Sequence, residues 1–312
     1  MMSQSIPLNS VAEPATSSST IASPKVPRSP KKVSRSFWVS TLRRLKRDPV
    51  AMVCAFILLV LVALAIFAPW LGLDDPNKMS IVKRLKPIGT PGHLLGTDEL
   101  GRDMLSRLIY GARLSLFTGF APVVIATLIG GMIGMIAGFA GGRVNMIIMR
   151  TVDVFYAFPS VLLAVAISTI MGAGILNTLV ALTLVFIPSI ARVSESVTTQ
   201  IRNQDFVEAA RATGARGWMI MRHHVLNNVT GPVLIYASSL ISVSIVMASG
   251  LSFLGLGVSP PDAEWGLMLN TLRSSIYVAP MQAILPGIMI FVTSMCFNLL
   301  SDGLRSAMDV KA

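Results

Sequence analysis

The sequence predicts an all-α integral membrane protein with six transmembrane helices. Apolar residues make up 53% of the 312 residues and charged residues 13%, and the mean hydropathy is +0.69. Several stretches of about twenty residues carry no charge, which is the length a helix needs to cross the hydrocarbon core. A water-soluble domain is excluded, because so apolar a chain has too little polar surface.

The charge of the chain has a distribution typical of membrane topology. The formal net charge is +11, and nine of the 26 Lys and Arg residues precede residue 48. Most of the others lie at the ends of predicted spans, as expected for basic residues that set orientation. We therefore expect no nucleic-acid partner. The two cysteines, Cys54 and Cys296, fall inside predicted spans and form neither a disulfide framework nor a thiolate metal site.

The N-terminal region divides into a tail and an anchor. Residues 1–36 are rich in Ser and Pro and lack an apolar stretch, which predicts a disordered cytoplasmic tail. Residues 37–71 predict an N-terminal membrane anchor helix, whose charge-free span, 50–69, follows a basic cluster and so starts inside. A cleaved signal peptide is the alternative, but this run is longer than a signal core and lies far from the N-terminus.

Residues 72–113 predict an extracytoplasmic loop that ends in an amphipathic helix. Thr97 is placed to cap this helix, with Asp98 and Glu99 in its first turn. Helical spacing places Leu100, Met104 and Leu108 on one apolar face. It also predicts an i,i+4 ion pair between Asp103 and Arg107. The acidic residues and His93 lack metal-ligand spacing, so a solvated face is preferred over a metal site.

Residues 114–301 predict a core of five further spans. In the first, 114–139, small residues recur every four positions, at Ala126, Gly130, Gly134 and Gly138. Such a stripe predicts close packing of a second helix in lipid, and no phosphate-binding loop is found in the chain. After a short cytoplasmic turn, the charge-free stretch 154–191 is too long for one span, and Gly172 to Gly174 mark the outer turn inside it.

A polar island, residues 200–228, lies between the fourth and fifth spans, within a loop spanning 194–230. Apolar sequence on both sides places the island in water. Four charged residues recur every three positions, which predicts i,i+3 ion pairs on a short surface helix: Arg202, Asp205, Glu208 and Arg211. Ala209 and Ala210 allow another surface to approach Glu208. Gly214 is expected to adopt a positive φ that ends this helix before a second one, 218–225.

The last part of the core carries two spans, 231–254 and 281–300. Ser238, Ser242 and Ser249 share one face of the first and would line a polar translocation path, or else bond to preceding carbonyls or a neighbouring helix, the preferred alternative. Between the spans, Pro260 and Pro261 interrupt an outer loop that continues to Glu264 and Trp265. Residues 302–312 are predicted to be a cytoplasmic C-terminus, so six spans place both termini inside.

Four segments resemble one family, the second permease subunit of the ABC importers for dipeptides, oligopeptides, nickel and glutathione. They are E-A-A-x-x-x-G at 208–214 followed by His224-Val225-Leu226, GTDELGRDMLSRLIYGARLSL at 96–116, LSFLGLGVSPPDAEWGLML at 251–269 and SDGLRSAMD at 301–309. The resemblance covers residues 37–309 and implies a MetI-like permease bundle. One departure is Asn227, where the family has a proline, so the entry to the fifth span is expected to be less rigid.

The resemblance also implies roles and partners. The island would couple to the ATPases through Asp205, Glu208, Ala209, Ala210, Arg211 and Gly214, and the loop with Pro260, Pro261, Glu264 and Trp265 would face a binding protein. The implied partners are a second homologous permease subunit forming a heterodimer, two cytoplasmic ATP-binding subunits and an extracytoplasmic solute-binding protein. The implied location is the bacterial inner membrane. Catalytic residues, cofactors and metals are not expected.

Two other functions compete with an ATP-driven importer for peptides or similar solutes. An ion- or proton-coupled carrier would keep an ionisable group inside the membrane to bind the coupling ion, and the six predicted spans contain none. A membrane-embedded enzyme would require a nucleophile with a base, or a metal set, at span level, but the histidines lie in loops or at span boundaries. The importer interpretation is therefore favoured.

Overall fold

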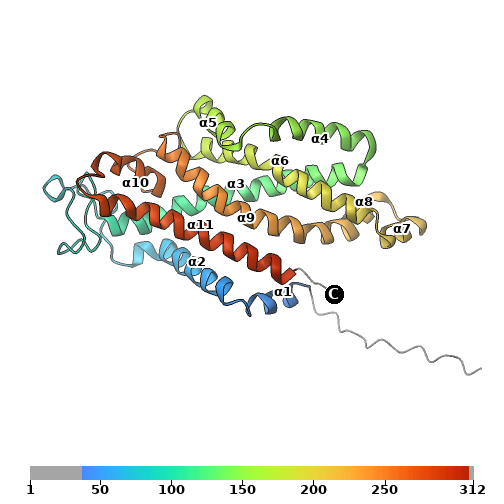
Figure 1. The fold of residues 1–312 in the computed structure, drawn as a ribbon, viewed down its shortest axis with the longest axis horizontal. Coiled ribbons are helices and arrows are strands. Elements are labelled where there is room, and N and C mark those ends of the chain that lie inside the picture. Colours follow the sequence, from blue (N-terminus) through green and yellow to red (C-terminus); the bar gives the residue numbers. More distant parts are fainter. Residues whose placement is uncertain (1–36, 309–312) are drawn as a thin grey trace, which may run out of the picture.

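The computed structural model describes residues 37–308, so the predicted tail 1–36 and the end of the chain lie outside the described residues. The described part is a helical bundle (Figure 1). Its α-helices are α1 Phe37–Leu45, α2 Pro49–Phe67, α3 Met104–Ala140, α4 Gly142–Tyr156, α5 Ser160–Met171, α6 Ile175–Arg202, α7 Asp205–Ala212, α8 Gly217–Ile220, α9 Leu226–Phe253, α10 Trp265–Leu272 and α11 Pro280–Met308.

The predicted six spans are recovered when one bent pair counts as a single span. Five helical segments are long and apolar enough to cross a membrane, and α4 and α5 pass the same test together although they are bent by 83°. The break falls at Pro159, which has no N–H for a continued helix. The turn predicted at Gly172 to Gly174 is present between α5 and α6. The expected short cytoplasmic turn before it is wrong, because Arg143, Arg150 and Asp153 lie on helix α4.

The N-terminal anchor is two helices, which corrects the prediction of one. The chain leaves the helical conformation between α1 and α2, where the Asp48 carboxylate accepts hydrogen bonds from the amides of Val50 and Ala51. Pro49 occupies the first position of α2, where its missing N–H costs no helical hydrogen bond. A capped start and a proline therefore fix where the membrane helix begins.

The separate amphipathic helix predicted before the second span does not form. Residues 97–103 make turns and a bridge between Thr97 and Asp103, and α3 begins at Met104 and continues through the predicted span as one helix of 37 residues. Asp103 is the N-cap, since its carboxylate accepts from the Ser106 amide. Thr97 caps nothing; its hydroxyl instead accepts from the Lys86 amide.

The small-residue stripe of α3 packs against α6, as predicted. A β-carbon built at Gly130 would lie 2.7 Å from the Ile187 carbonyl oxygen, and one at Gly138 would lie 2.7 Å from the Glu195 carbonyl oxygen. At Gly134 the corresponding atom would overlap the Ala191 carbonyl oxygen. The backbones of the two helices thus approach each other along three turns, and any side chain on this stripe would separate them.

The two ends of the bundle carry different structures. α7, α8 and the described ends of the chain, α1 and the C-terminal end of α11, lie at one end (Figure 1). The segment between α2 and α3 and helix α10 lie at the opposite end. The largest apolar core runs between them and joins α3, α5, α6 and α9, and a smaller one under the outer segment includes Met104, Leu108, Trp265 and Met268.

Candidate functional site

Helix α7 of the polar island ends in a Schellman motif centred on Gly214. The Gly214 amide donates to the Arg211 carbonyl at 2.9 Å, and the Ala215 amide donates to the Ala210 carbonyl at 3.1 Å. This pattern requires a left-handed residue after the helix, and Gly214 has φ +82°. The predicted positive φ is therefore confirmed. The motif turns the chain from α7 into α8 and so fixes the angle between the two.

The island is anchored by a few buried apolar side chains and exposes the rest. Val207, Ile220 and Val225 are buried in the largest core. Because Val207 faces inward from α7, the same helix turns Asp205, Glu208, Ala209 and Arg211 outward, where they are exposed, while Ala210 packs partly against the core. Four large apolar side chains of the island are also exposed: Phe206, Trp218, Met219 and Leu226. The island thus presents an outward surface that carries both charged and apolar side chains.

The predicted ion pairs along the island do not form among the described residues. Instead, the Arg202 guanidinium donates to the Gly138 and Phe139 carbonyls at 3.2 and 3.3 Å, which satisfies the end of α3. The Arg211 guanidinium lies 6.0 Å from the Phe139 ring centroid. Helical spacing alone missed these contacts, because the end of α3 is more than sixty residues away in the sequence. Glu208 has no ion-pair partner in the described part of the chain.

The second helix of the island continues directly into the fifth span. α8 passes into a π-helical turn, Met221–Val225, and then into α9. Asn227 lies inside α9, and its side-chain amide donates to the His223 carbonyl at 3.2 Å. His223 and His224 are exposed. The wider helical turn falls at the junction between island and span, and such turns are frequent at functional sites.

At the end of the bundle opposite the island, two residues predicted to face a binding protein are not exposed. Glu264 and Trp265 are both fully buried, whereas Pro260 and Pro261 are exposed. The Glu264 carboxylate caps α10 by accepting from the amides of Gly266 and Leu267 at 2.9 and 2.8 Å. It also accepts from the Ser115 hydroxyl of α3 at 3.1 Å. The Trp265 indole N–H donates to the Leu108 carbonyl, so both side chains lock α10 onto α3.

Burial changes the ionisation of Glu264. Removal from water raises the pKa of its carboxyl above the usual value, while hydrogen bonds from Gly266, Leu267, Ser252 and Ser115 act in the opposite direction. The group sits at a helix N-terminus, where a carboxylate satisfies otherwise unpaired amides. Its role in the structure is therefore positioning within the fold.

A buried ionic cluster holds the segment before α3. The Asp98 carboxylate pairs with Arg102 at 2.6 Å and lies 3.4 Å from the Arg107 guanidinium. Arg107 also donates to the Pro76 carbonyl, at 3.0 Å, and to the Asp262 carbonyl, at 3.4 Å. The predicted pair of Asp103 with Arg107 is wrong, because the chain is not helical before Met104. The Arg107 guanidinium instead links three separate segments, which contain Pro76, Asp98 and Asp262; these segments are called the outer cap.

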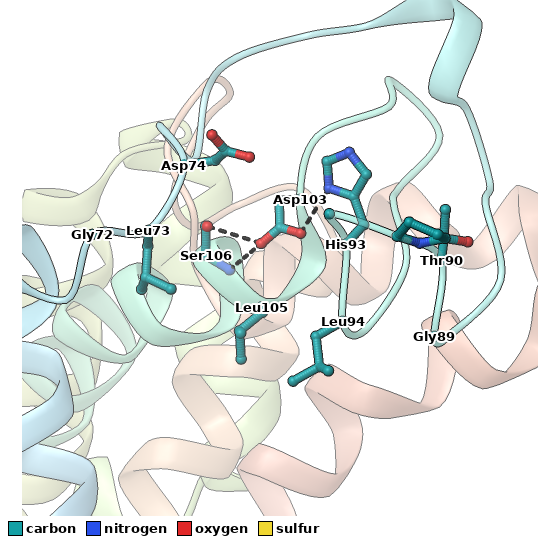
Figure 2. A pocket seen from close by; sticks show the side chains of 12 residues that line it. Gly72, Leu73, Asp74, Gly89, Thr90, His93, Leu94, Asp103, Leu105 and Ser106 are labelled. Atoms are coloured by element: carbon teal, nitrogen blue, oxygen red, sulfur yellow. Dashed lines mark hydrogen bonds and ion pairs between the residues drawn. The ribbon is translucent and has the colours of Figure 1, made fainter.

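A cavity of about 490 Å³ opens beside this cluster, with His93, Asp103 and Ser106 in its wall (Figure 2). Nδ1 of His93 lies 3.0 Å from one Asp103 oxygen, and the other oxygen accepts from the Ser106 hydroxyl at 2.8 Å. The carboxylate therefore stands between the imidazole and the hydroxyl. Nucleophilic catalysis needs the imidazole next to the hydroxyl, so this arrangement holds the outer loop to α3 and does not activate Ser106.

Metal binding is likewise without support in residues 37–308, where no three His, Cys, Asp or Glu side chains come together as ligands.

Two of the three serines of α9, Ser238 and Ser242, make the hydrogen bonds of the preferred alternative. The Ser238 hydroxyl donates to the Ile235 carbonyl at 2.7 Å and lies 2.8 Å from the Ser301 hydroxyl of α11. The Ser242 hydroxyl donates to the Ser239 carbonyl at 2.8 Å. Ser249 is buried, and its backbone carbonyl lies against Gly266 of α10. Of the three, Ser242 lines an open groove between α5, α9 and α11, together with Ser160, Ser294 and Asn298.

Sequence reasoning missed the polar contacts between α4 and α6. Arg192 of α6 pairs with Asp153 of α4, and the Glu195 carboxylate accepts from the Asn145 side chain at 2.6 Å. Arg192 and Glu195 lie on α6 just beyond the charge-free stretch 154–191, so the helix continues past the predicted span. The apolar stretch ends before Arg192, but α6 continues through the charged residues to Arg202, which brings them beside α4. The pairing itself could not be deduced from spacing.

Comparison with protein families gives two matches. Residues 130–311 match the family described as binding-protein-dependent transport system inner membrane component. Residues 36–87 match the family described as N-terminal TM domain of oligopeptide transport permease C.

Individual proteins agree with these families. The chain is 41% identical over 277 residues to the glutathione transport system permease protein GsiD of Pectobacterium atrosepticum, covering 89% of this chain and 91% of that protein. A GsiD of Escherichia coli is 38% identical over the same shares. Among solved structures, an inward-facing MetNI methionine ABC transporter superposes with a TM-score of 0.52 at 18% identity, covering 64% of this chain and 97% of that chain. The last likeness concerns the fold alone.

Proposed function

This chain belongs to the inner membrane components of binding-protein-dependent transport systems and is a permease of an ABC importer; from that premise we propose that its island, residues 200–228, receives the motion of separate ATP-hydrolysing subunits. The solute would be a peptide or a similar small molecule such as glutathione, as in the named relatives. The island would convert nucleotide binding outside the membrane into alternating access within it.

The single observation that carries this proposal is the outward surface of α7. Val207 and the Schellman motif at Gly214 hold the helix rigidly on the bundle, while Glu208 and Ala209 face away from it. Trp218 beside them is 71% exposed although it is large and apolar. Exposed aromatic side chains next to an unpaired charge are typical of protein interfaces. A partner protein at this end of the bundle would cover them.

The proposed assembly contains three kinds of partner. Two ATP-binding subunits would contact the islands, and a solute-binding protein would contact the outer cap at Pro260 and Pro261. A second homologous permease subunit would face the groove that Ser242 lines, so that the translocation path forms between the two permeases. In this arrangement both termini are cytoplasmic; α1 and the C-terminal end of α11, where the described residues begin and end, lie at the same end of the bundle (Figure 1). The ion-coupled carrier is not supported by any of the matches.

A charge reversal on α7 tests the proposal. In the assembled importer, we expect Glu208→Lys to abolish ATP hydrolysis stimulated by the loaded binding protein and to reduce co-purification of the ATPases. Like charges facing each other at an interface cost several kcal/mol. Asp302→Lys is the matched control, because it makes the same charge change at an exposed site on α11 at the same end of the bundle. Normal transport by Glu208→Lys would reduce the island to a connector.

A further inference from the structure

An ion pair with an aromatic neighbour lies on an open face of the bundle, away from the island. Nη2 of Arg192 in α6 lies 2.5 Å from an Asp153 oxygen in α4, and the guanidinium carbon lies 4.6 Å from the Tyr156 ring centroid. The two charged side chains are 48% and 40% exposed, and Tyr156 is exposed as well. The charges are thus paired and oriented, yet accessible from outside the chain.

The cluster stands where the third span is broken. Tyr156 is the last residue of α4, and α5 begins four residues later at Ser160 after the 83° bend. Helices α4 and α6 therefore meet at Arg192, next to the break. Broken membrane helices characteristically carry solute sites, because their irregular backbone must line a cavity.

A groove between α5, α9 and α11 includes Ser160, four residues after Tyr156 in the chain. Ser160 and Val243 line that groove, whose volume is about 490 Å³. Ser294 and Asn298 of α11 add hydroxyl and amide groups to the groove. Hydrogen-bonding groups thus line a groove that begins, at Ser160, close in the chain to the pair of opposite charges.

Placing the charges of Arg192 and Asp153 on span-forming helices costs free energy, so we expect the pair to have a function. Elsewhere between α4 and α6, the Glu195 carboxylate is engaged by the side chains of Asn145 and Thr199, at 2.6 and 3.0 Å. The Arg192 pair is instead half open. Ionisable groups within membrane helices are expensive and mark solute or ion pathways. A guanidinium held over an aromatic ring keeps donors available for a carboxylate.

We propose that Arg192 and Asp153 form a recognition site for a zwitterionic, peptide-like solute, with Arg192 binding its carboxylate and Asp153 its ammonium group. The assignment rests on the proposed function. The solute exchanges places with the internal ion pair, so each charge has a partner before and after binding. Because one pair replaces another, binding stays weak enough for release, as transport requires. Tyr156 positions the guanidinium.

An apolar replacement of the pair separates recognition from folding. Replacing both partners by apolar groups of similar volume usually preserves stability, whereas removing one leaves an unpaired charge. The variant is Arg192→Met with Asp153→Leu in the complete importer, reconstituted in vesicles with its binding protein. Radiolabelled reduced glutathione and a labelled dipeptide serve as probes. We expect ATP-dependent uptake to fall by about tenfold or more, as loss of charge-assisted hydrogen bonds predicts, while assembly and ATP hydrolysis stimulated by the binding protein are retained.

Two single variants complete the test. Arg192→Lys keeps the charge without the fork and is expected to show an intermediate loss of uptake. Arg143→Met removes an exposed arginine at the start of α4 and is expected to transport normally. Normal uptake by the double variant overturns the recognition site, and so does a parallel loss of stimulated ATP hydrolysis, which identifies a conformational latch. A wild-type complex that imports neither probe refutes the proposed function itself, and the site with it.

Discussion

Gly134 of α3 lies directly against the backbone of Ala191 in α6, and a β-carbon at Gly134 would overlap the Ala191 carbonyl oxygen. Helical backbone on both sides leaves no flexible side chain to move away. The position therefore tolerates no residue larger than glycine without a shift of the whole helix. Since α6 also carries Arg192, Glu195 and the approach to the island, this contact sets the geometry of both proposed sites.

Gly134→Ala should destabilise the bundle, whereas Gly131→Ala should not. Both glycines are buried in α3, and alanine gains helix propensity equally at either. A β-carbon at Gly131 meets only Val233 Cγ1, at 4.0 Å, which is ordinary contact. Overpacking at Gly134 is expected to cost about 1–3 kcal/mol. Thermal unfolding of the two variants in detergent measures the difference, and equal melting temperatures would contradict the close α3–α6 packing.

Gly214→Val should impair coupling while leaving membrane insertion intact. No atom lies within 4 Å of a β-carbon built at Gly214, so the penalty comes from its φ of +82° and not from a clash. A β-branched residue in this conformation costs at least ~1 kcal/mol. We expect the turn into α8 to shift and stimulated ATP hydrolysis to fall. Gly217→Ala is the control, since its β-carbon makes ordinary contact with Phe139 at 3.6 Å.

Glu264 should make stability depend on pH. Its pKa is raised in the folded protein by burial, so at a pH below the usual value of 4.5 the carboxyl is protonated in both states and burial costs no ionisation energy. As pH rises through 4.5 toward the raised pKa, the unfolded chain releases its proton first, and stability falls. Melting temperatures across this range, compared with those of Glu264→Gln, measure the effect. A wild-type advantage that grows with pH would contradict the assignment.

Cysteine labelling tests the orientation. In a background lacking Cys54 and Cys296, Val82→Cys at an 89% exposed position of the outer cap should react with an impermeant maleimide added from outside. Ser196→Cys, exposed on α6 near the island, should react only after the membrane is opened. The reverse pattern would place the island outside and exclude its contact with cytoplasmic ATPases.

Much of the architecture could be predicted from the sequence. Charge-free length predicted the spans, the four-residue recurrence of small residues predicted the α3–α6 interface, and Gly214 predicted the end of α7. In each case the determining interaction is local or repeats along one helix. The E-A-A segment at 208–214 and the segments 96–116 and 251–269 similarly indicated the family, which the matched relatives confirm.

The charged side chains were placed wrongly wherever their partners are distant in sequence. Arg107 was expected to pair within one helix, yet it binds Asp98, and Glu264 was expected to face outward, yet it is buried under α10. Arg192 meets Asp153 across 39 positions. A helical sequence by itself determines which residues share a face, because the helical repeat is fixed by the backbone. Only the tertiary structure decides which partner a charged side chain contacts. A buried charge without a partner costs free energy, so in the folded chain it is paired with a group that the packing brings close.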